Sequence, residues 1–126
     1  MANNILADTS ALINLQIGSK TSLKTFEKIK ERLVVSRIST CEFIYGSKNN
    51  KEKEINADFL QHFITLEIDQ EISKYSYSLL IKYGLKTKFS VADSLIASSA
   101  IVQNLEFWTF NTKHFKNIQE LKFFTE

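Results

Sequence analysis

The sequence predicts an α/β fold: a three-layer α/β/α sandwich with a mainly parallel central sheet of four to five strands. Short apolar runs rich in β-branched residues alternate along the chain with segments of helical periodicity, a pattern typical of parallel sheets. The 126 residues are 44% hydrophobic and 24% charged, the balance of an ordinary globular protein. They contain no proline and only three glycines. We therefore expect one compact, helix-rich domain over residues 1–126.

The first half of the chain predicts two strands and several helices. Residues 5–7 (Ile-Leu-Ala) form an apolar run that ends abruptly at Asp8, as a buried strand does. Apolar residues at helical spacing predict a helix within 21–31, and residues 33–35 (Leu-Val-Val) predict the second strand. Helical patterns then lie on either side of Asn49 and Asn50.

The second half repeats the alternation of strand and helix. Residues 64–68 (Ile-Thr-Leu-Glu-Ile) alternate apolar and polar, which favours a partly covered strand near a sheet edge. Asp69 is the expected N-cap of the following helix, whose apolar stripe is Ile72, Tyr75, Leu79 and Tyr83. Residues 90–104 are apolar nearly all round and predict a buried helix. Residues 106–110 and 121–124 are the last two expected strands.

Composition bounds the cellular setting more than the function. The single cysteine, Cys41, leaves no internal disulfide to form, which indicates a reducing cytoplasm. The first residues lack the basic and apolar regions of a signal peptide, and no run approaches the ~20 apolar residues that span a bilayer. We therefore expect a cytoplasmic protein that does not enter a membrane. The net charge of +2 neither indicates nor excludes a nucleic-acid partner.

Polar residues follow the expected strands at the points where those strands end. Asp8 comes directly after the first strand, and Glu42 lies just beyond the second, in the first turn of an expected helix. Asp93 lies in the first turn of the buried helix, and Asn111 follows the strand at 106–110. Parallel strands share one carboxyl-terminal edge, where open α/β folds place their sites. We expect these side chains to share one cleft.

Clustered carboxylates repel one another unless a cation or a proton relieves the conflict. Mg²⁺ and Mn²⁺ are hard cations that prefer oxygen ligands, and they activate water for attack on a phosphodiester. Because the expected site is all-oxygen, with no cysteine or histidine pair among its residues, structural zinc is not expected. This pattern therefore predicts a Mg²⁺ (or Mn²⁺) site used in phosphodiester hydrolysis.

Each acid also has a purely structural explanation. Asp8 can cap the helix that follows it, and Ser39 can act as an N-cap with Glu42 at the third position of a capping box. Ser90 and Asp93 fit the same arrangement. The two interpretations are compatible, because a first-turn acid held by backbone donors still offers an oxygen to a metal.

Four segments together resemble the motifs of PIN domains, and particularly those of the VapC toxins of bacterial toxin–antitoxin pairs. They are residues 8–10 (Asp-Thr-Ser), 38–43 (Ile-Ser-Thr-Cys-Glu-Phe), 91–97 (Val-Ala-Asp-Ser-Leu-Ile-Ala) and 109–115 (Thr-Phe-Asn-Thr-Lys-His-Phe). They occur in the family's order and span essentially the whole chain.

The resemblance implies a Mg²⁺- or Mn²⁺-dependent endoribonuclease that acts as the toxin of a VapBC-type pair. It also implies frequent homodimers and a small VapB-like antitoxin whose tail covers the acidic cleft. Asp8, Glu42 and Asp93 match the family's acidic metal-site positions, and Asn111 matches the polar residue of its last motif. His114 stands where many relatives have a fourth acid. Because an imidazole does not supply the negative charge of a carboxylate, the resemblance does not imply a second metal ion. We interpret His114 as a cap of the short segment beginning there, the alternative being a contact with phosphate or water.

The mechanism expected from this pattern gives each residue a role. Asp8 and Asp93 bind the metal, directly or through water; Glu42 completes its shell or orients the attacking water; and Asn111 positions a metal-bound water or the scissile phosphate. Four lysines are expected to border the cleft and hold RNA phosphates: Lys86, Lys88, Lys113 and Lys116. Unused apolar side chains on the early helices are expected to form a dimer face or an antitoxin groove.

Three other functions are compatible with parts of the pattern. A PIN-like module that binds RNA or protein without cutting it would be expected to lack a central acid, and none is missing here. A receiver or phosphatase domain would carry further acids beside Asp8 or a suitably placed lysine, and a DNA-directed 5′-nuclease would need more acids and a longer chain. We therefore favour the ribonuclease.

Overall fold

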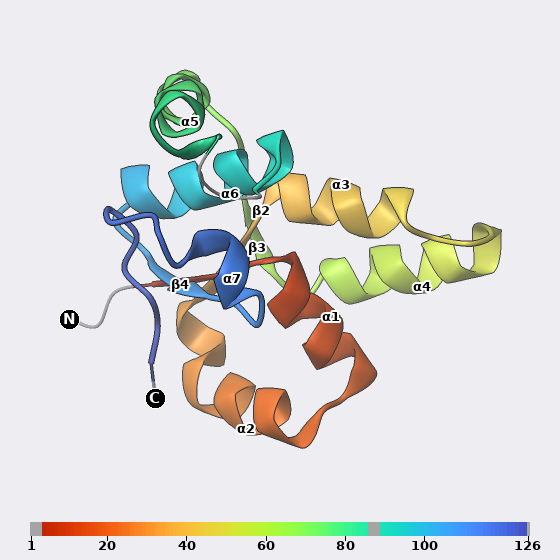
Figure 1. The fold of residues 1–126 in the computed structure, drawn as a ribbon. Helices are drawn as coiled ribbons and strands as arrows, with labels where there is room; N and C mark the ends of the chain where they lie inside the picture. The colour runs from red at the N-terminus through yellow and green to blue at the C-terminus, as the bar shows by residue number, and fades with distance from the viewer. Residues whose placement is uncertain (1–3, 86–88, 126) are drawn as a thin grey trace.

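The computed structural model describes residues 4–85 and 89–125, so Lys86 and Lys88 lie outside the described residues. Its sheet has four strands in the order β3-β2-β1-β4, and all of its strand pairs are parallel (Figure 1). The strands are β1 (Ile5–Ala7), β2 (Leu33–Ser36), β3 (Ile64–Leu66) and β4 (Glu106–Trp108). This confirms the predicted α/β architecture with a parallel central sheet.

The helices before β4 lie between successive strands, the last helix follows β4, and most of them begin at a residue suited to capping. They are α1 (Thr9–Ile17), α2 (Lys20–Ile29), the 3-10 turn η1 (Lys30–Arg32), α3 (Arg37–Tyr45), α4 (Asn50–Leu60), α5 (Gln70–Tyr83), α6 (Val91–Val102) and α7 (Thr112–Phe115). The side chains that accept a first-turn N–H of α1 to α6 are Asp8, Ser19, Ser36, Asn49, Asp69 and Ser90. The predicted cap at Asp69 is confirmed.

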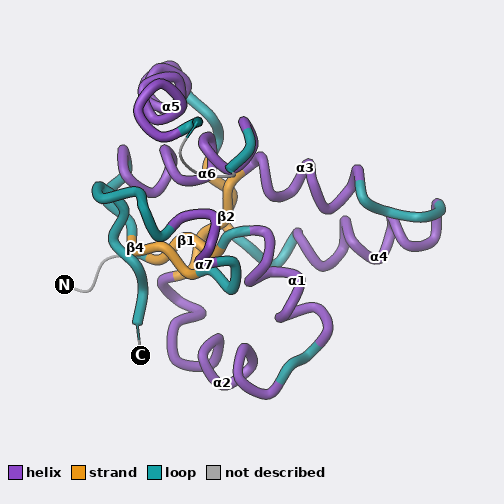
Figure 2. The backbone as a smooth tube through the Cα atoms, viewed as in Figure 1, coloured by secondary structure: helices purple, strands orange, loops and turns teal. Residues whose placement is uncertain are grey.

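Alternating side chains of the strands enter two separate cores. Leu6 and Phe107 are 0% exposed and pack with residues of α5 and α6 on one face. Ile5 and Val35, also 0% exposed, and Trp108 pack with residues of α1 to α4 on the other face. Figures 1 and 2 show α5 and α6 on one side of the sheet and α1 and α2 on the other. Helices on both faces explain why β1 and β2 are buried along their whole length.

The strand order reverses direction once. From β1 the chain adds β2 and then β3 outward, and after α5 and α6 it returns to place β4 on the opposite side of β1. The carboxyl ends of β1 and β4 therefore flank the point at which the order reverses. Open α/β sheets bind ligands at such a point, because the connections there leave in opposite directions and open a crevice.

The predicted fifth strand, at 121–124, is wrong except for one residue. Within this segment only Phe123 forms a bridge, parallel to Phe107 of β4. The N–H of Phe107 donates to Lys122 O, and the carbonyl of Phe107 accepts the N–H of Phe124, each at 2.8 Å. Leu121 is instead bound in a turn, with its N–H donating to Ile118 O, so the segment joins the sheet too late to extend the pairing.

The start of α3 also differs from the prediction. Its N-cap is Ser36, the last residue of β2, whose hydroxyl accepts the N–H of Ile38 at 3.1 Å. Ser39 is therefore buried inside the helix and is not its cap, and Glu42 lies in the second turn rather than the first. The predicted capping box at Ser39 and Glu42 is wrong because the strand passes directly into the helix.

Within the described part of the chain, no helix combines the length and the apolar character needed to cross a membrane.

Candidate active site

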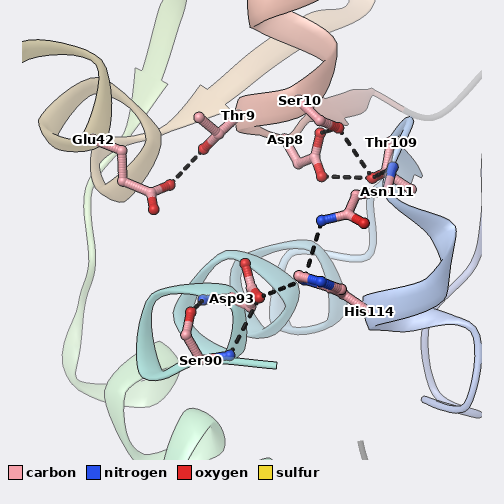
Figure 3. Close-up of polar contacts among 9 residues, drawn as sticks. All are labelled: Asp8, Thr9, Ser10, Glu42, Ser90, Asp93, Thr109, Asn111 and His114. Carbon is pink, nitrogen blue, oxygen red and sulfur yellow. Dashed lines mark hydrogen bonds and ion pairs between the residues drawn. The ribbon is translucent and has the colours of Figure 1, made fainter. Parts of the chain in front are cut away.

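The four predicted site residues line one cleft at the carboxyl edge of the sheet. Its volume is about 380 Å³, and its lining residues are Asp8, Thr9, Ser10, Ile13, Glu42, Ser90, Asp93, Ile96, Asn111 and His114. Figure 3 shows the side chains of Asp8, Glu42, Asp93 and Asn111 around a common space. Glu42 lies on α3 and Asp93 on α6, whereas Asp8 directly follows β1 and Asn111 directly precedes α7. The prediction that these residues share a cleft is confirmed.

Asp8 is the most buried of the acids, with 4% of the residue exposed. Its Oδ1 accepts the hydroxyl of Ser10 at 2.6 Å and the N–H of Ala11 at 3.0 Å, so it caps α1 as predicted. Its Oδ2 accepts the hydroxyl of Thr109 at 2.6 Å, from the segment directly after β4 (Figure 3). Asp8 therefore joins the ends of β1 and β4.

The backbone fixes the direction of these hydroxyl bonds. Ser10 Oγ accepts the N–H of Phe110, and Thr109 Oγ1 accepts the N–H of Asn111, each at 2.9 Å. With their oxygens accepting from the backbone, both hydroxyls point their single hydrogen at Asp8. The carboxylate is thus presented to the cleft in one fixed orientation.

Burial raises the pKa of Asp8 above its ordinary value, and the nearby charge of Asp93 acts in the same direction. The hydrogen bonds from Ser10, Thr109 and Ala11 lower the pKa, but together they do not offset the desolvation. Ionised Asp8 is consequently under electrostatic stress that a cation in the cleft would relieve.

Glu42 reaches the cleft from α3 through a chain of hydroxyls. Its Oε1 accepts the hydroxyl of Thr9 at 2.6 Å, and Thr9 Oγ1 lies 2.9 Å from the hydroxyl of buried Ser39. The Thr9 hydroxyl is the donor in both contacts, and the shorter one is with the carboxylate. The residue after Asp8 therefore orients the second acid.

Asp93 belongs to the capping box of α6, as the sequence predicts. Its N–H donates to Ser90 Oγ at 3.1 Å, and its Oδ2 accepts the N–H of Ser90 at 3.2 Å. The same Oδ2 lies 3.2 Å from Nδ1 of His114 on α7, and the Asp93 side chain is 19% exposed. The cap and the place in the cleft coexist, because only one carboxylate oxygen is used in the box.

His114 lies in the cleft and is not a cap. α7 begins at Thr112, so His114 is its third residue, and the N-cap position belongs to Asn111, whose side chain makes no capping bond. Instead, Nδ2 of Asn111 lies 3.0 Å from Nδ1 of His114 (Figure 3). The interpretation of His114 as a cap is therefore wrong: the helix starts too early for it, and its ring turns towards Asp93.

The donor set of the cleft suits a hard divalent cation. Three carboxylates and one amide line it, and no lysine or arginine is among its lining residues. Across residues 4–85 and 89–125, no three histidine, cysteine or acidic side chains stand close enough to form a complete cage. Mg²⁺ commonly binds through one or two carboxylates and keeps several water ligands, so it does not require such a cage.

Sequence reasoning missed the hydroxyls of Ser10, Thr9 and Thr109, which orient the acids. Their signal was present, since two of them directly follow Asp8 and the third directly follows β4. Which acid each hydroxyl serves could not be read from the sequence, because Thr109 and Asp8 are 101 residues apart.

Comparison with known proteins agrees with this geometry. The PIN domain family model matches residues 5–121. The chain is 34% identical over 122 residues to "Ribonuclease VapC1" of Methanocaldococcus jannaschii, which covers 94% of this chain and 83% of that protein.

Two solved structures have the same fold. A toxin–antitoxin complex from Klebsiella pneumoniae contains a chain of 28% identity and TM-score 0.78, covering 94% of this chain and 95% of that one. VapBC2 from Rickettsia felis, bound to a DNA fragment from its promoter, has a TM-score of 0.82 at 24% identity, covering 95% and 96%. With an acidic cleft at the switch point of a parallel sheet and a family match over nearly all of its length, the chain belongs to the PIN-domain family, in its VapC branch.

Proposed function

We propose that this protein is a Mg²⁺- or Mn²⁺-dependent endoribonuclease that cleaves cytoplasmic RNA as the toxin of a VapBC-type pair. The observation that carries the proposal is the convergence of Asp8, Glu42 and Asp93 with Asn111 in one cleft that no lysine or arginine lines. The relative named a ribonuclease supports RNA as the substrate.

Asp8 and Asp93 would hold the cation, directly or through water, and the cation would supply a Lewis acid at the scissile phosphate. Oε1 of Glu42 is occupied by Thr9. Its Oε2 has no hydrogen bond to another described residue, and it can accept a proton from the attacking water. Asn111, at the carboxyl end of β4, can donate to a phosphate oxygen or to a water.

Lysines beside the cleft would hold the RNA backbone. Lys113 lies on α7 and Lys116 directly follows it, and both are exposed. Phosphate contacts position a nucleic acid without reading its sequence. Replacing both lysines by glutamine should weaken RNA binding and flatten its salt dependence, as should replacing Lys86 and Lys88. Binding that is unchanged at every salt concentration would remove the lysines from the proposal.

An antitoxin would occupy the apolar groove between α1, α2 and α4. Its volume is about 520 Å³, and its lining residues are Leu15, Leu23, Phe26, Lys30, Phe59, His62 and Phe63. Leu23 is 44% exposed there, and an exposed apolar groove is typical of a surface that receives a partner. The complex from Klebsiella pneumoniae supports a partner of the antitoxin kind.

A homodimer is the assembly we propose, as the family resemblance implies. The large apolar residues exposed on α5 are Tyr77 and Ile81, at 69% and 72%. Light scattering of wild-type protein and of Ile81→Glu would test this face, and a monomeric wild type would contradict the dimer.

The decisive experiment is cleavage of total cellular RNA by purified, antitoxin-free protein in Mg²⁺, Mn²⁺ or EDTA. Discrete cuts that require metal and disappear in Asp93→Asn are the expected result. Asp69→Asn is the matched control, because Asp69 also caps a helix but lies outside the cleft.

The contrary result is equally specific. If folded wild-type protein makes no metal-dependent cuts in several RNA pools, the chain is a PIN-like binding module rather than a nuclease. If Asp93→Asn cuts as wild type does, the assignment of the site is wrong although the activity stands.

A further inference from the structure

The residue pair Asp93 and His114 carries an inference about how the third acid is oriented. His114 lines the acidic cleft, and its Nδ1 lies 3.2 Å from Oδ2 of Asp93. It approaches Asp93 from a different element, α7, across 21 residues of sequence. The neighbouring Phe115 is 1% exposed and packs on Phe107 with ring centroids 4.8 Å apart, which fixes α7 against the sheet.

The two neighbours of His114 Nδ1 require different tautomers. Asp93 Oδ2, at 3.2 Å, can only accept a hydrogen bond, so it requires an N–H on Nδ1. Asn111 Nδ2, at 3.0 Å, can only donate, so it requires a lone pair there. One nitrogen cannot satisfy both.

The charge of Asp93 decides between the tautomers. A hydrogen bond to a carboxylate is roughly twice as strong as one between neutral groups. A lone pair on Nδ1 would moreover face the carboxylate oxygen and be repelled. A half-turn of the Asn111 amide brings its Oδ1 to Nδ1 and removes the remaining conflict.

We infer that His114 is a positioning residue: with a proton on Nδ1 it holds Asp93 Oδ2, which leaves Oδ1 as the oxygen that Asp93 offers to a cation. Oδ2 also accepts the Ser90 N–H, whereas Oδ1 forms no hydrogen bond with any other described residue. Figure 3 shows Oδ1 pointing away from His114, towards the side of the cleft where Asp8 lies. Carboxylates that bind metals are commonly held by hydrogen bonds from residues outside the metal's own shell.

The tautomer can be measured on the metal-free protein, independently of nuclease activity. The sequence has two histidines, His62 and His114, so long-range ¹H–¹⁵N spectra at alkaline pH contain two imidazole patterns. The pattern that disappears in His114→Asn should show Nδ1–H, and it should move towards Nε2–H, the form preferred in water, in Asp93→Asn. Nε2–H in the wild-type protein would overturn the inference.

The orienting role, which rests on the proposed function, is tested by Mn²⁺ binding. His114→Ala should weaken Mn²⁺ affinity about tenfold, the usual effect of losing a residue that supports a ligand. His114→Asn, whose amide lies where Nδ1 lay, should recover more affinity than His114→Gln. Equal affinity of wild type and His114→Ala would overturn the role. Should wild-type protein bind no Mn²⁺, the proposed metal site fails, while the tautomer still decides whether His114 holds Asp93.

Discussion

Asp8 illustrates how a single residue is prepared for its role. Two hydroxyls and a backbone N–H hold the carboxylate, yet burial and the charge of Asp93 still raise its pKa. Three donors would ordinarily favour the ionised form. Because desolvation outweighs these donors, a cation bound in the cleft would stabilise the ionised carboxylate of Asp8.

This balance predicts how the stability of the metal-free protein depends on pH. The pKa of Asp8 is higher in the folded than in the unfolded state, so its protonation stabilises the fold fully below the unfolded pKa of about 3.9. This contribution is lost as pH rises through the raised folded pKa. Asp8→Asn cannot ionise and keeps a capping side chain, so its stability relative to wild type should increase over the same interval.

Urea unfolding in EDTA, from acidic to neutral pH, measures this difference. The gap between the two free energies of unfolding should be flat below the unfolded pKa and should then grow in favour of Asp8→Asn. A wild-type protein that gains stability relative to the variant as pH rises would show that hydrogen bonding, not desolvation, dominates at Asp8.

Substitution of Thr109 should lower the free energy of unfolding without changing the charge of the protein. Thr109→Val removes a donor to Asp8 and the acceptor of the Asn111 N–H while nearly preserving volume. We expect a loss of about 1–2 kcal/mol in the free energy of unfolding. Thr21→Val is the control, since Thr21 is exposed and its side chain bonds to no described residue. Equal effects of the two substitutions would deny the hydroxyl its bridging role.

At the scale of elements, helix ends determine where the site residues stand. Asp8 is the N-cap of α1, and Ser90 is the N-cap of α6. The first cap is itself a site residue, and the second places Asp93 in the first turn of α6, beside the cleft. The other end of α1 is fixed by Gly18, whose φ of 86° lies in the left-handed region and whose N–H donates to Asn14 O and Leu15 O. The left-handed conformation of Gly18 ends α1 and lets the chain turn into α2.

Substitution of Gly18 tests this turn. A Cβ at this position meets only Leu23 Cδ1, at 4.0 Å, so the cost is conformational rather than steric. Gly18→Ala should lower the free energy of unfolding by about 1–2 kcal/mol. Gly18→Asn should cost less, because asparagine tolerates the left-handed region. An alanine variant as stable as wild type in thermal and urea unfolding would exclude this account.

At the scale of the whole molecule, the reversal of strand order creates the site. Asp8 and Asn111 come from the two strands beside that reversal, while α3 and α6 bring Glu42 and Asp93 to the same edge. The sequence predicted this convergence because each residue follows or begins an element whose apolar pattern is strong. Parallel strands then leave only one edge at which those residues can gather.

What the sequence could not predict depends on contacts between distant segments. The strand expected at 106–110 ends at Trp108, because the Phe110 N–H turns to Ser10 Oγ. The place of His114 beside Asp93 likewise depends on a partner 21 residues away in the sequence. The start of α3 depends on which of two nearby serines, Ser36 or Ser39, caps the helix. Local pattern carries no information about such pairs.

The central claim is that Asp8 and Asp93, which are 85 residues apart in the sequence, hold one and the same cation. Mn²⁺ titration of wild type, Asp8→Asn, Asp93→Asn and the double variant, followed by electron paramagnetic resonance, tests it most directly. Each single variant should lose more than about tenfold in affinity, at least the effect of losing a residue that only supports a ligand. Because both residues would serve one ion, the double variant should bind about as weakly as either single one. Affinities that match wild type, or losses that simply add, would contradict a shared site.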